Sequence, residues 1–264
     1  MRALRAGQAF DGERFIGPVD VVLDGGDIVE VSPWREHGGD VALEDLGDAT
    51  VLPGLVDAHQ HLSWDCSTEP LGWHQASDDG VLLETARANA ERALRAGITT
   101  VRDLGARGAV GTDLRNGFAA DPGTGPRILA AGPALTTPGG HCHFLGGECA
   151  DGPELIAAVG RLADAGVRCV VATDAGIGPL KPHDILCRAL TQAVELVGVT
   201  TQEALVMCTS RAANALAIGD VAGRLAAGRP ADLLVVAGRL DLDPGALLRP
   251  VRVLRLGVDV LESG

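Results

Sequence analysis

The sequence contains few aromatic residues and a single lysine, Lys181. Aromatic side chains make up 3% of the 264 residues and tyrosine is absent, so a buried core has to be built mainly from alanine, valine, leucine and isoleucine. Because 46% of the residues are apolar, the chain can bury the core of one large domain or of two modest ones.

Basic charge and long apolar runs are lacking as well. The formal net charge is −13, whereas a nucleic-acid-binding protein is expected to carry a basic patch or stripe, so we expect no nucleic-acid partner. No apolar stretch reaches the roughly 18 residues that indicate a membrane span, so we expect no membrane association.

Six cysteines are present, but none forms a CxxC pair: Cys66, Cys142, Cys149, Cys169, Cys187 and Cys208. The N-terminal sequence MRALRAGQAF lacks the apolar centre of a signal peptide. This combination predicts reduced thiols in a cytoplasmic protein.

Motifs of several other enzyme classes are missing. The chain contains no GxSxG element of a serine hydrolase, and neither a GxGxxG nor a GxxxxGK[ST] phosphate-binding loop.

The chain divides into three regions by its pattern of predicted elements. Residues 1–54 consist of strand-like runs and turns, including a hairpin at 18–33 around Asp-Gly-Gly-Asp. Residues 55–218 alternate between apolar strands and helical patterns, which predicts a parallel α/β architecture. Residues 219–264 return to strands, so the two ends of the chain are expected to form one small sheet domain.

The alternating region is predicted in detail as follows. Strands are expected at 55–62, 98–105, 127–136 and 167–176. Helices are expected at 81–96, 108–119, 152–166, 183–197 and 201–217. Gly97 is placed to end the first helix, and Thr200 with Glu203 has the spacing of a capping box at the start of the last.

Two histidines lie at the end of the first of these strands, in VLPGLVDAHQHL. His59 and His61 point to the same face because side chains alternate along a strand, and Asp57 shares that face. At the carboxyl end of a parallel strand, two such imidazoles can reach one cation. The pattern alone leaves open a second interpretation, two histidines with ordinary hydrogen bonds.

Asp174 ends the strand-like run VRCVVATD and precedes Ala-Gly. A carboxylate at this position can bind a metal and accept a proton from water, although an aspartate in a turn or at a helix start is common. His183 follows shortly afterwards and could line the same opening or favour the start of a helix. Asp103, at the tip of another strand, is expected to hold its own loop in place.

A glycine-rich loop, TPGGHCHFLGGEC at 137–149, contains His141 and His143. Structural zinc sites usually arrive as two separated ligand pairs, whereas this cluster is contained in one short segment. We therefore expect a mobile active-site loop whose histidines contact substrate; an ordinary glycine-rich connection is the alternative.

Taken together these segments resemble the metal-dependent amidohydrolase superfamily, closest to its imidazolonepropionase-like and Xaa-Pro dipeptidase-like branch. The matching segments, in chain order, are PGLVDAHQHL, GITTVRDLG, GGHCHFLGGE, TDAG and GRPADLLVV. The resemblance implies a (β/α)₈ barrel beside a small β-sandwich formed by both chain ends. It also implies that His59, His61 and Asp174 bind metal, and that Asp174 is the general base.

The length does not fit a complete barrel. Residues 55–218 number 164, and a barrel rarely has fewer than about 200. Only four strand–helix units are present, and by resemblance they correspond to the first three and the eighth. The resemblance also implies a metal-bridging lysine and two further metal-binding histidines before the eighth strand. These are missing, because no histidine lies between His143 and His183 and the only lysine, Lys181, follows Asp174. The join is expected within LADAGVRCVV, at 162–171.

The sequence therefore predicts a truncated barrel at 55–218 with a β-sandwich formed from 1–54 and 219–264. Its expected activity is hydrolysis of a carbon–nitrogen bond in a small molecule, with one divalent metal ion, preferably Zn²⁺. Exposed sheet edges predict self-association into a homo-oligomer. The alternatives are a catalytically inactive relative that serves as a binding scaffold, and an artefact of the gene sequence.

Overall fold

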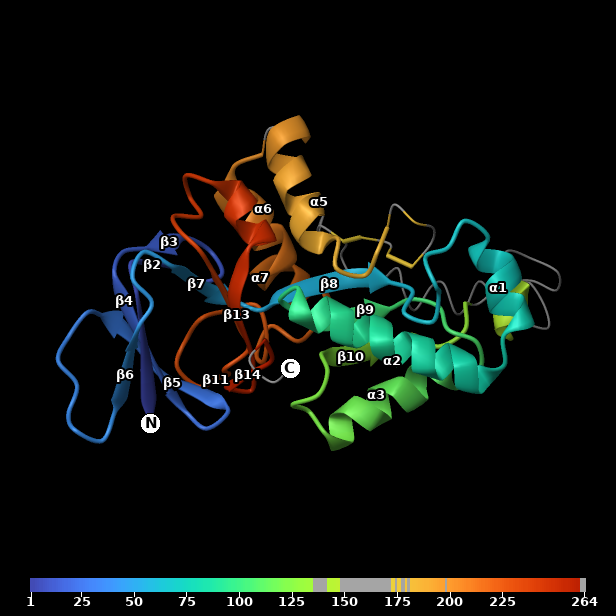
Figure 1. Ribbon diagram of the computed structural model, residues 1–264, viewed down its shortest axis with the longest axis horizontal. Helices are drawn as coiled ribbons and strands as arrows, with labels where there is room; N and C mark the ends of the chain where they lie inside the picture. The colour runs from blue at the N-terminus through green and yellow to red at the C-terminus, as the bar shows by residue number, and fades with distance from the viewer. Residues whose placement is uncertain are drawn as a thin grey trace.

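The computed structural model describes residues 1–134, 142–147, 172–173, 175–176, 179, 181–197 and 199–261. Within these residues the chain forms three β-sheets with helices against the third (Figure 1). The α/β class predicted from the sequence is confirmed.

The first sheet has five strands in the order β11-β5-β4-β1-β6. Their bounds are β1 (Arg2–Ala6), β4 (Val19–Asp24), β5 (Asp27–Pro33), β6 (Ala42–Asp45) and β11 (Arg229–Pro230). β4 and β5 pair in antiparallel orientation across Gly25 and Gly26, which confirms the predicted hairpin. Gly25 has a φ of +56°, a conformation that glycine adopts without the steric penalty of a side chain.

The second sheet has six strands in the order β14-β13-β12-β7-β2-β3. Their bounds are β2 (Gln8–Phe10), β3 (Phe15–Ile16), β7 (Thr50–Pro53), β12 (Leu233–Val236), β13 (Pro250–Arg255) and β14 (Val258–Asp259). The four residues of β12 are buried, and the strand pairs with β7 on one side and β13 on the other. The two chain ends are therefore joined in one sheet. A cluster of buried aliphatic residues from both sheets lies between them.

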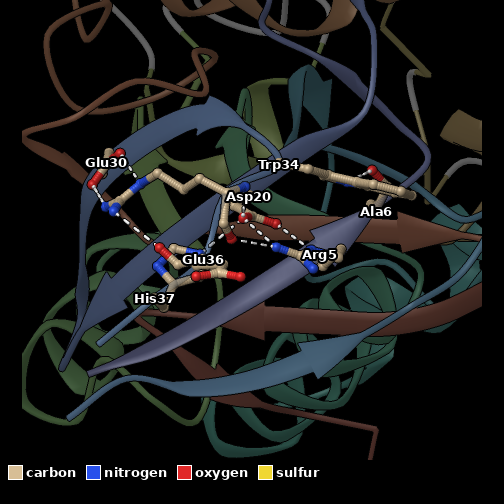
Figure 2. A network of polar contacts seen from close by, with 8 residues as sticks. Arg5, Ala6, Asp20, Glu30, Trp34, Glu36 and His37 are labelled. Carbon is tan, nitrogen blue, oxygen red and sulfur yellow. Dashed lines mark hydrogen bonds and ion pairs between the residues drawn. The ribbon is translucent and has the colours of Figure 1, made fainter. Parts of the chain in front are cut away.

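A buried carboxylate on β4 fixes the loop that follows β5 (Figure 2). Asp20 accepts hydrogen bonds at 2.8 Å from Arg5 Nε and Arg5 Nη2, and another at 3.1 Å from the Arg35 backbone N–H. His37 Nε2 lies 2.8 Å from the same carboxylate. His37, for which the sequence offered no role, thus belongs to a structural network in the first sheet.

The third sheet is parallel and begins directly after β7. It consists of β8 (Leu55–Gln60), β9 (Ile98–Asp103) and β10 (Arg127–Ala130), with β9 in the centre. The connections carry α1 (Pro70–Ala76), α2 (Asp79–Arg95) and α3 (Val110–Ala120). The predicted parallel strand–helix alternation is confirmed over this part of the chain, although β10 is shorter than the predicted strand at 127–136.

Gly54 marks the passage from the second sheet to the third. A β-carbon at this buried position would overlap the side chain of Thr99 on β9. The Gly54 backbone N–H donates to Asp232 O at 2.8 Å, and Leu55 N donates to Gly97 O at 2.9 Å. Glycine at this position leaves room for the side chain of Thr99 to pack against the backbone of the connection.

A fourth segment lies against the other side of β8. Ala175 forms a parallel bridge with Gln60, and His61 N donates to Ala175 O at 2.8 Å. Most of the predicted strand at 167–176 and the whole predicted helix at 152–166 lie outside the described residues.

The chain then continues as α5 (Leu186–Gln192), the π-helical η2 (Ala193–Val197), α6 (Thr201–Cys208) and α7 (Ser210–Ala215). The single helix predicted at 201–217 is wrong, because Thr209 interrupts it with φ −124° and ψ −100°. The Thr209 hydroxyl donates to Leu205 O at 2.6 Å, which competes with helical hydrogen bonding. Short 3₁₀ turns occur at η1 (His143–Leu145) and η3 (Pro244–Leu248).

Within the described residues, no helix combines the length and the apolar character that a membrane crossing needs. Four of the cysteines are described, Cys66, Cys142, Cys187 and Cys208, and all are free thiols.

Candidate metal and active site

The two histidines of the HxH motif meet at the carboxyl end of β8. His59 and His61 are half-buried, and their Nε2 atoms lie 3.3 Å apart. The ring planes are inclined at 68° to each other, so the two nitrogens approach each other without stacking of the rings. The structure thus brings together the two histidines that the sequence predicts as metal ligands.

The distance between the two Nε2 atoms is close to that expected for two ligands of one cation. Two imidazole nitrogens on one tetrahedral zinc ion, each at 2.0–2.1 Å, are about 3.3 Å apart. A hydrogen bond between the rings would bring them to a similar distance. The distance between the two Nε2 atoms therefore matches both a shared divalent cation and a shared proton.

Asp57 does not reach toward the two rings but anchors the neighbouring segment. Its carboxylate accepts from Thr173 Oγ1 at 2.6 Å, from Thr173 N at 3.2 Å and from Gln60 Nε2 at 2.9 Å. It also accepts from the His59 backbone N–H at 3.1 Å. The burial of Asp57 raises its pKa, while these four donors act in the opposite direction. The side chain ties β8 to the segment around Thr173.

Asp174, the predicted third ligand and general base, lies outside the described residues, but both of its neighbours are described. Ala175 N donates to Thr173 Oγ1 at 3.0 Å, and Ala175 O accepts from His61 N at 2.8 Å. A β-carbon on Gly176, which has a φ of +112°, would overlap His61 O. The chain on both sides of position 174 is therefore held against the end of β8.

His183, for which the sequence left open a place at the opening or at the start of a helix, is fully buried beside β8. Its Nδ1 lies 3.1 Å from Gln60 Oε1 and its Nε2 lies 3.4 Å from Trp64 O. Gln60 Nε2 in turn donates to His183 O at 3.2 Å. Burial lowers the pKa of His183 to about 4, so the ring is neutral at physiological pH. It positions the backbone and does not line the opening.

An aromatic cluster that the sequence did not indicate lies next to His61. Trp64 has its ring centroid 6.3 Å from that of His61 and stacks on His74 at 4.7 Å. Asn89 of α2 fixes this loop by donating to Trp64 O at 2.9 Å. His74 is buried, which lowers its pKa to about 4. An isolated histidine on a short helix carries no spacing signal that would have revealed this contact.

The glycine-rich loop reaches this cluster through Phe144, whose ring lies 6.2 Å from that of Trp64. His143 begins the 3₁₀ turn η1 and is exposed. Leu145 O accepts from Gly108 N at 3.2 Å, so the turn packs on the loop after β9. The structure places His143 in a loop beside the histidine pair; His141 lies outside the described residues.

Asp103 ends β9 beside the same region and holds its own loop, as predicted. Its Oδ1 accepts from Gly105 N at 3.1 Å, whereas its Oδ2 has no hydrogen-bond partner in the described part of the chain. Burial raises the pKa of this carboxyl group to about 6.

Gly105 lies directly against the ring of His61. A β-carbon there would be 3.4 Å from His61 Nδ1, which is ordinary van der Waals contact. The loop after β9 thereby supports one of the two imidazoles.

No group of three or more histidine, cysteine, aspartate or glutamate side chains is arranged to hold a metal within the described residues. Of the three metal ligands predicted from the sequence, the described residues include His59 and His61. Lys181, the only lysine, follows the Ala175–Gly176 segment, and its backbone oxygen accepts from Gly176 N at 2.9 Å.

Comparison with known proteins gives matches in both sequence and structure. Two models of the amidohydrolase family match, one over residues 50–157 and the other over residues 134–258. The imidazolonepropionase of Chromobacterium violaceum is 47% identical over 77 residues, which cover 29% of this chain and 18% of that protein. The N-substituted formamide deformylase of Arthrobacter pascens is 33% identical over 165 residues, covering 55% and 29% respectively. The matched parts span less than a third of either relative.

A solved structure of a Xaa-Pro dipeptidase with methionine in its active site has a TM-score of 0.75 and 19% identity, covering 98% of this chain and 99% of that one. Such a likeness shows a shared fold. Two family models that together run from residue 50 to residue 258 agree with it, and the chain belongs to the amidohydrolase superfamily.

Proposed function

We propose that this protein is a metal-dependent hydrolase that cleaves a carbon–nitrogen bond in a small molecule. The observation that carries the proposal is the 3.3 Å approach of His59 Nε2 and His61 Nε2 at the carboxyl end of a parallel strand. Active sites of barrel enzymes form at this end of the strands. One divalent cation, preferably Zn²⁺, would be held by His59, His61 and Asp174.

The hydrogen bonds around position 174 support its inclusion. Asp57 holds Thr173, and His61 holds Ala175, so both neighbours of Asp174 are bound to the strand that carries the histidines. Two histidines and one carboxylate form a ligand set that leaves a coordination position open, as catalytic zinc sites do.

In the proposed reaction a bound divalent cation supplies Lewis acidity, which makes water nucleophilic near neutral pH. Asp174 accepts the proton of the attacking water and returns it to the leaving nitrogen. His141 and His143 orient the substrate from the glycine-rich loop. The aromatic cluster of Trp64, His74 and Phe144 shields this side of the site from water.

The substrate is an amide, a cyclic amide or a dipeptide-like compound. The curated relatives include a formamide deformylase, and a structural neighbour is a dipeptidase; both names denote cleavage at nitrogen attached to a carbonyl group. The free thiols of the described cysteines fit a reducing, cytoplasmic location.

We further infer a shortened barrel of four strand–helix units, with a β-sandwich built from residues 1–54 and 219–264. The bridge between Gln60 and Ala175 supports this arrangement, because it gives the strand order β10-β9-β8 followed by the Ala175 segment. In a closed barrel the last strand pairs with the first in the same way. Barrel strands four to seven are the part proposed to be missing.

Metal analysis of the purified protein tests the function directly. We expect about one equivalent of zinc, manganese or iron, and its loss in His59→Ala and His61→Ala. His143→Ala is the matched control: it keeps the metal and loses hydrolysis of small amides. If the protein carries no stoichiometric metal and His59→Ala changes neither its thermal stability nor its activity, the proposal is wrong.

A second candidate function is a catalytically inactive scaffold that binds a partner or a second copy. It is favoured by the sequence that would complete a larger metal site: no histidine lies between His143 and His183, and the only lysine, Lys181, follows Asp174. A protein of this kind would bind no metal and would associate in sedimentation analysis. A strictly monomeric and metal-loaded protein would contradict it.

A further inference from the structure

A cavity of about 720 Å³ lies between α2, the start of α5 and the turn η3. None of its lining residues belongs to the candidate metal site. Its volume is in the range of small-molecule pockets. The lining residues are Arg92, Arg95, Ala96, Pro179, Pro182, Asp184, Ile185, Cys187, Arg188, Leu247, Leu248 and Pro250.

The charge of this cavity is opposite to that of the protein as a whole. Its lining contains three exposed arginines, Arg92, Arg95 and Arg188, and one carboxylate, Asp184, which pairs with Arg92 at 3.2 Å. The Arg95 and Arg188 side chains have no ion pair or hydrogen bond with any described residue. Two uncompensated guanidinium groups therefore border one cavity on a chain whose net charge is −13.

Helix electrostatics explains only part of this arrangement. Arg92 and Arg95 lie in the last turn of α2, where cations stabilise the helix dipole. Arg188 belongs to α5, a separate element of seven residues, and lies near its beginning, where a cation is unfavourable. Helix stability therefore does not account for the place of Arg188 in the lining of this cavity.

The rest of the lining is largely apolar. Leu247 is buried, Leu248 has 49% of its surface exposed, and Ile185 is half-buried. Pro182 and Pro250 add rigid apolar rings. The lining therefore offers an occupant both guanidinium groups and aliphatic surface.

We propose that this cavity binds a small amphiphilic anion, a molecule with a carboxylate or phosphate group and an aliphatic body. Arg95 and Arg188 pair with the anionic group, because guanidinium binds carboxylate and phosphate through paired hydrogen bonds. Leu247 and Leu248 contact the aliphatic body. The site is separate from the metal centre, so a ligand bound there does not compete with the hydrolysed substrate.

Calorimetric titration of the full chain at low salt tests the proposal with four probes: octanoate, octyl phosphate, 1-octanol and inorganic phosphate. We expect one equivalent of octanoate or octyl phosphate to bind. The affinity should fall by about tenfold or more in the double variant Arg95→Ala with Arg188→Ala. The control Arg115→Ala removes an exposed arginine of α3 outside the cavity and should bind as the wild type does.

The other possible results of these titrations each support or overturn the proposed binding site. Equal binding of 1-octanol, or unchanged affinity in the double variant, would overturn the role of the arginines. Inorganic phosphate that binds as tightly as octyl phosphate would overturn the role of the aliphatic surface. Octanoate binding that disappears in His59→Ala would assign the ligand to the metal site, whereas retained binding in that variant supports a separate site. Thermal unfolding of each variant checks that it folds.

Discussion

Two buried aspartates show how local surroundings decide the charge of the same side chain. The hydrogen bonds from Arg5 to Asp20 lower the pKa of Asp20 to about 2. Burial without a cationic partner raises the pKa of Asp103 to about 6. The first group therefore stabilises the fold as an anion, and the second destabilises it when it ionises.

Asp20→Asn should lower the free energy of unfolding at pH 7 by about 2 kcal/mol, because the anion loses its bonds with Arg5. The folded-state pKa is below the unfolded value, so this contribution is present above pH 4 and is lost as the pH falls toward 2. Urea unfolding over this range should show the two proteins converging in acid. The exposed Asp40→Asn is the control, and a difference independent of pH would contradict the assignment.

Asp103→Asn should have the opposite effect. Because the folded-state pKa is raised, the wild type loses stability as the pH rises from about 4 through 6. At pH 8 the variant should be more stable by about 2 kcal/mol, and at pH 4 the two proteins should be equal. Denaturant unfolding at both pH values measures this difference; an equal gain at both would show that charge is not the cause.

At this scale the sequence was informative where residues had a fixed spacing. His59 and His61 could be predicted to face the same way, because alternation along a strand is set by backbone geometry. The contact of Trp64 with His74 could not, because it depends on how α1 folds back over the loop after β8. Position 174 and His141 stay predictions.

At the scale of elements, local sequence signals predicted where a helix begins or ends better than whether it runs on without a break. The hydroxyl of Thr200 accepts from Glu203 N at 3.1 Å, as the cap spacing indicated. The Glu203 carboxylate pairs with Arg211 at 2.8 Å, so the reciprocal half of a capping box is replaced by an ion pair. At the break, the local hydrogen bond of the Thr209 hydroxyl is accompanied by close packing from another segment, since a β-carbon on Gly223 would overlap Thr209 O.

The passage between the second and third sheets offers a test of element packing. Gly54→Ala should cost about 1–3 kcal/mol, because its β-carbon overlaps Thr99 and the buried strands have no room to separate. Gly72→Ala in α1 is the matched control: nothing lies within 4 Å, and alanine should stabilise that helix by about 0.5–1 kcal/mol.

Chemical denaturation measures both substitutions. In a Thr99→Ala background the cost of Gly54→Ala should shrink, because the overlapping atoms are gone. An unchanged cost would locate the strain elsewhere and would contradict the packing explanation.

At the scale of the whole molecule, the sequence predicted that both chain ends contribute strands, and β12 is hydrogen bonded to β7 and β13. It could not predict the division into a five-stranded and a six-stranded sheet, because several strands have only two to four residues. Pairing over such short lengths is set by neighbours distant in sequence and not by local propensity.

A buried ion pair joins the six-stranded sheet to the parallel sheet. Arg255 Nη1 lies 2.7 Å from Asp232 Oδ1, and Arg255 Nε donates to Gly125 O, shortly before β10, at 3.2 Å. Arg255→Leu should lower the free energy of unfolding by about 3–5 kcal/mol, because the Asp232 carboxylate stays buried without its partner. It should also separate the unfolding of the two regions, which calorimetry and hydrogen exchange together can resolve.

A double variant separates the contribution of this ion pair to stability from its role in connecting the two sheets. Combining Arg255→Leu with Asp232→Leu removes both charges, so most of the stability should return, because apolar replacements of buried ion pairs are often neutral. The contact with Gly125 stays lost, so separate unfolding of the two sheets should persist. Arg239→Ala, which breaks an exposed pair with Asp241, should change the free energy of unfolding little, because water screens an exposed ion pair. If the double variant unfolds in a single cooperative transition, the sheets are coupled through their apolar contacts and not through Arg255.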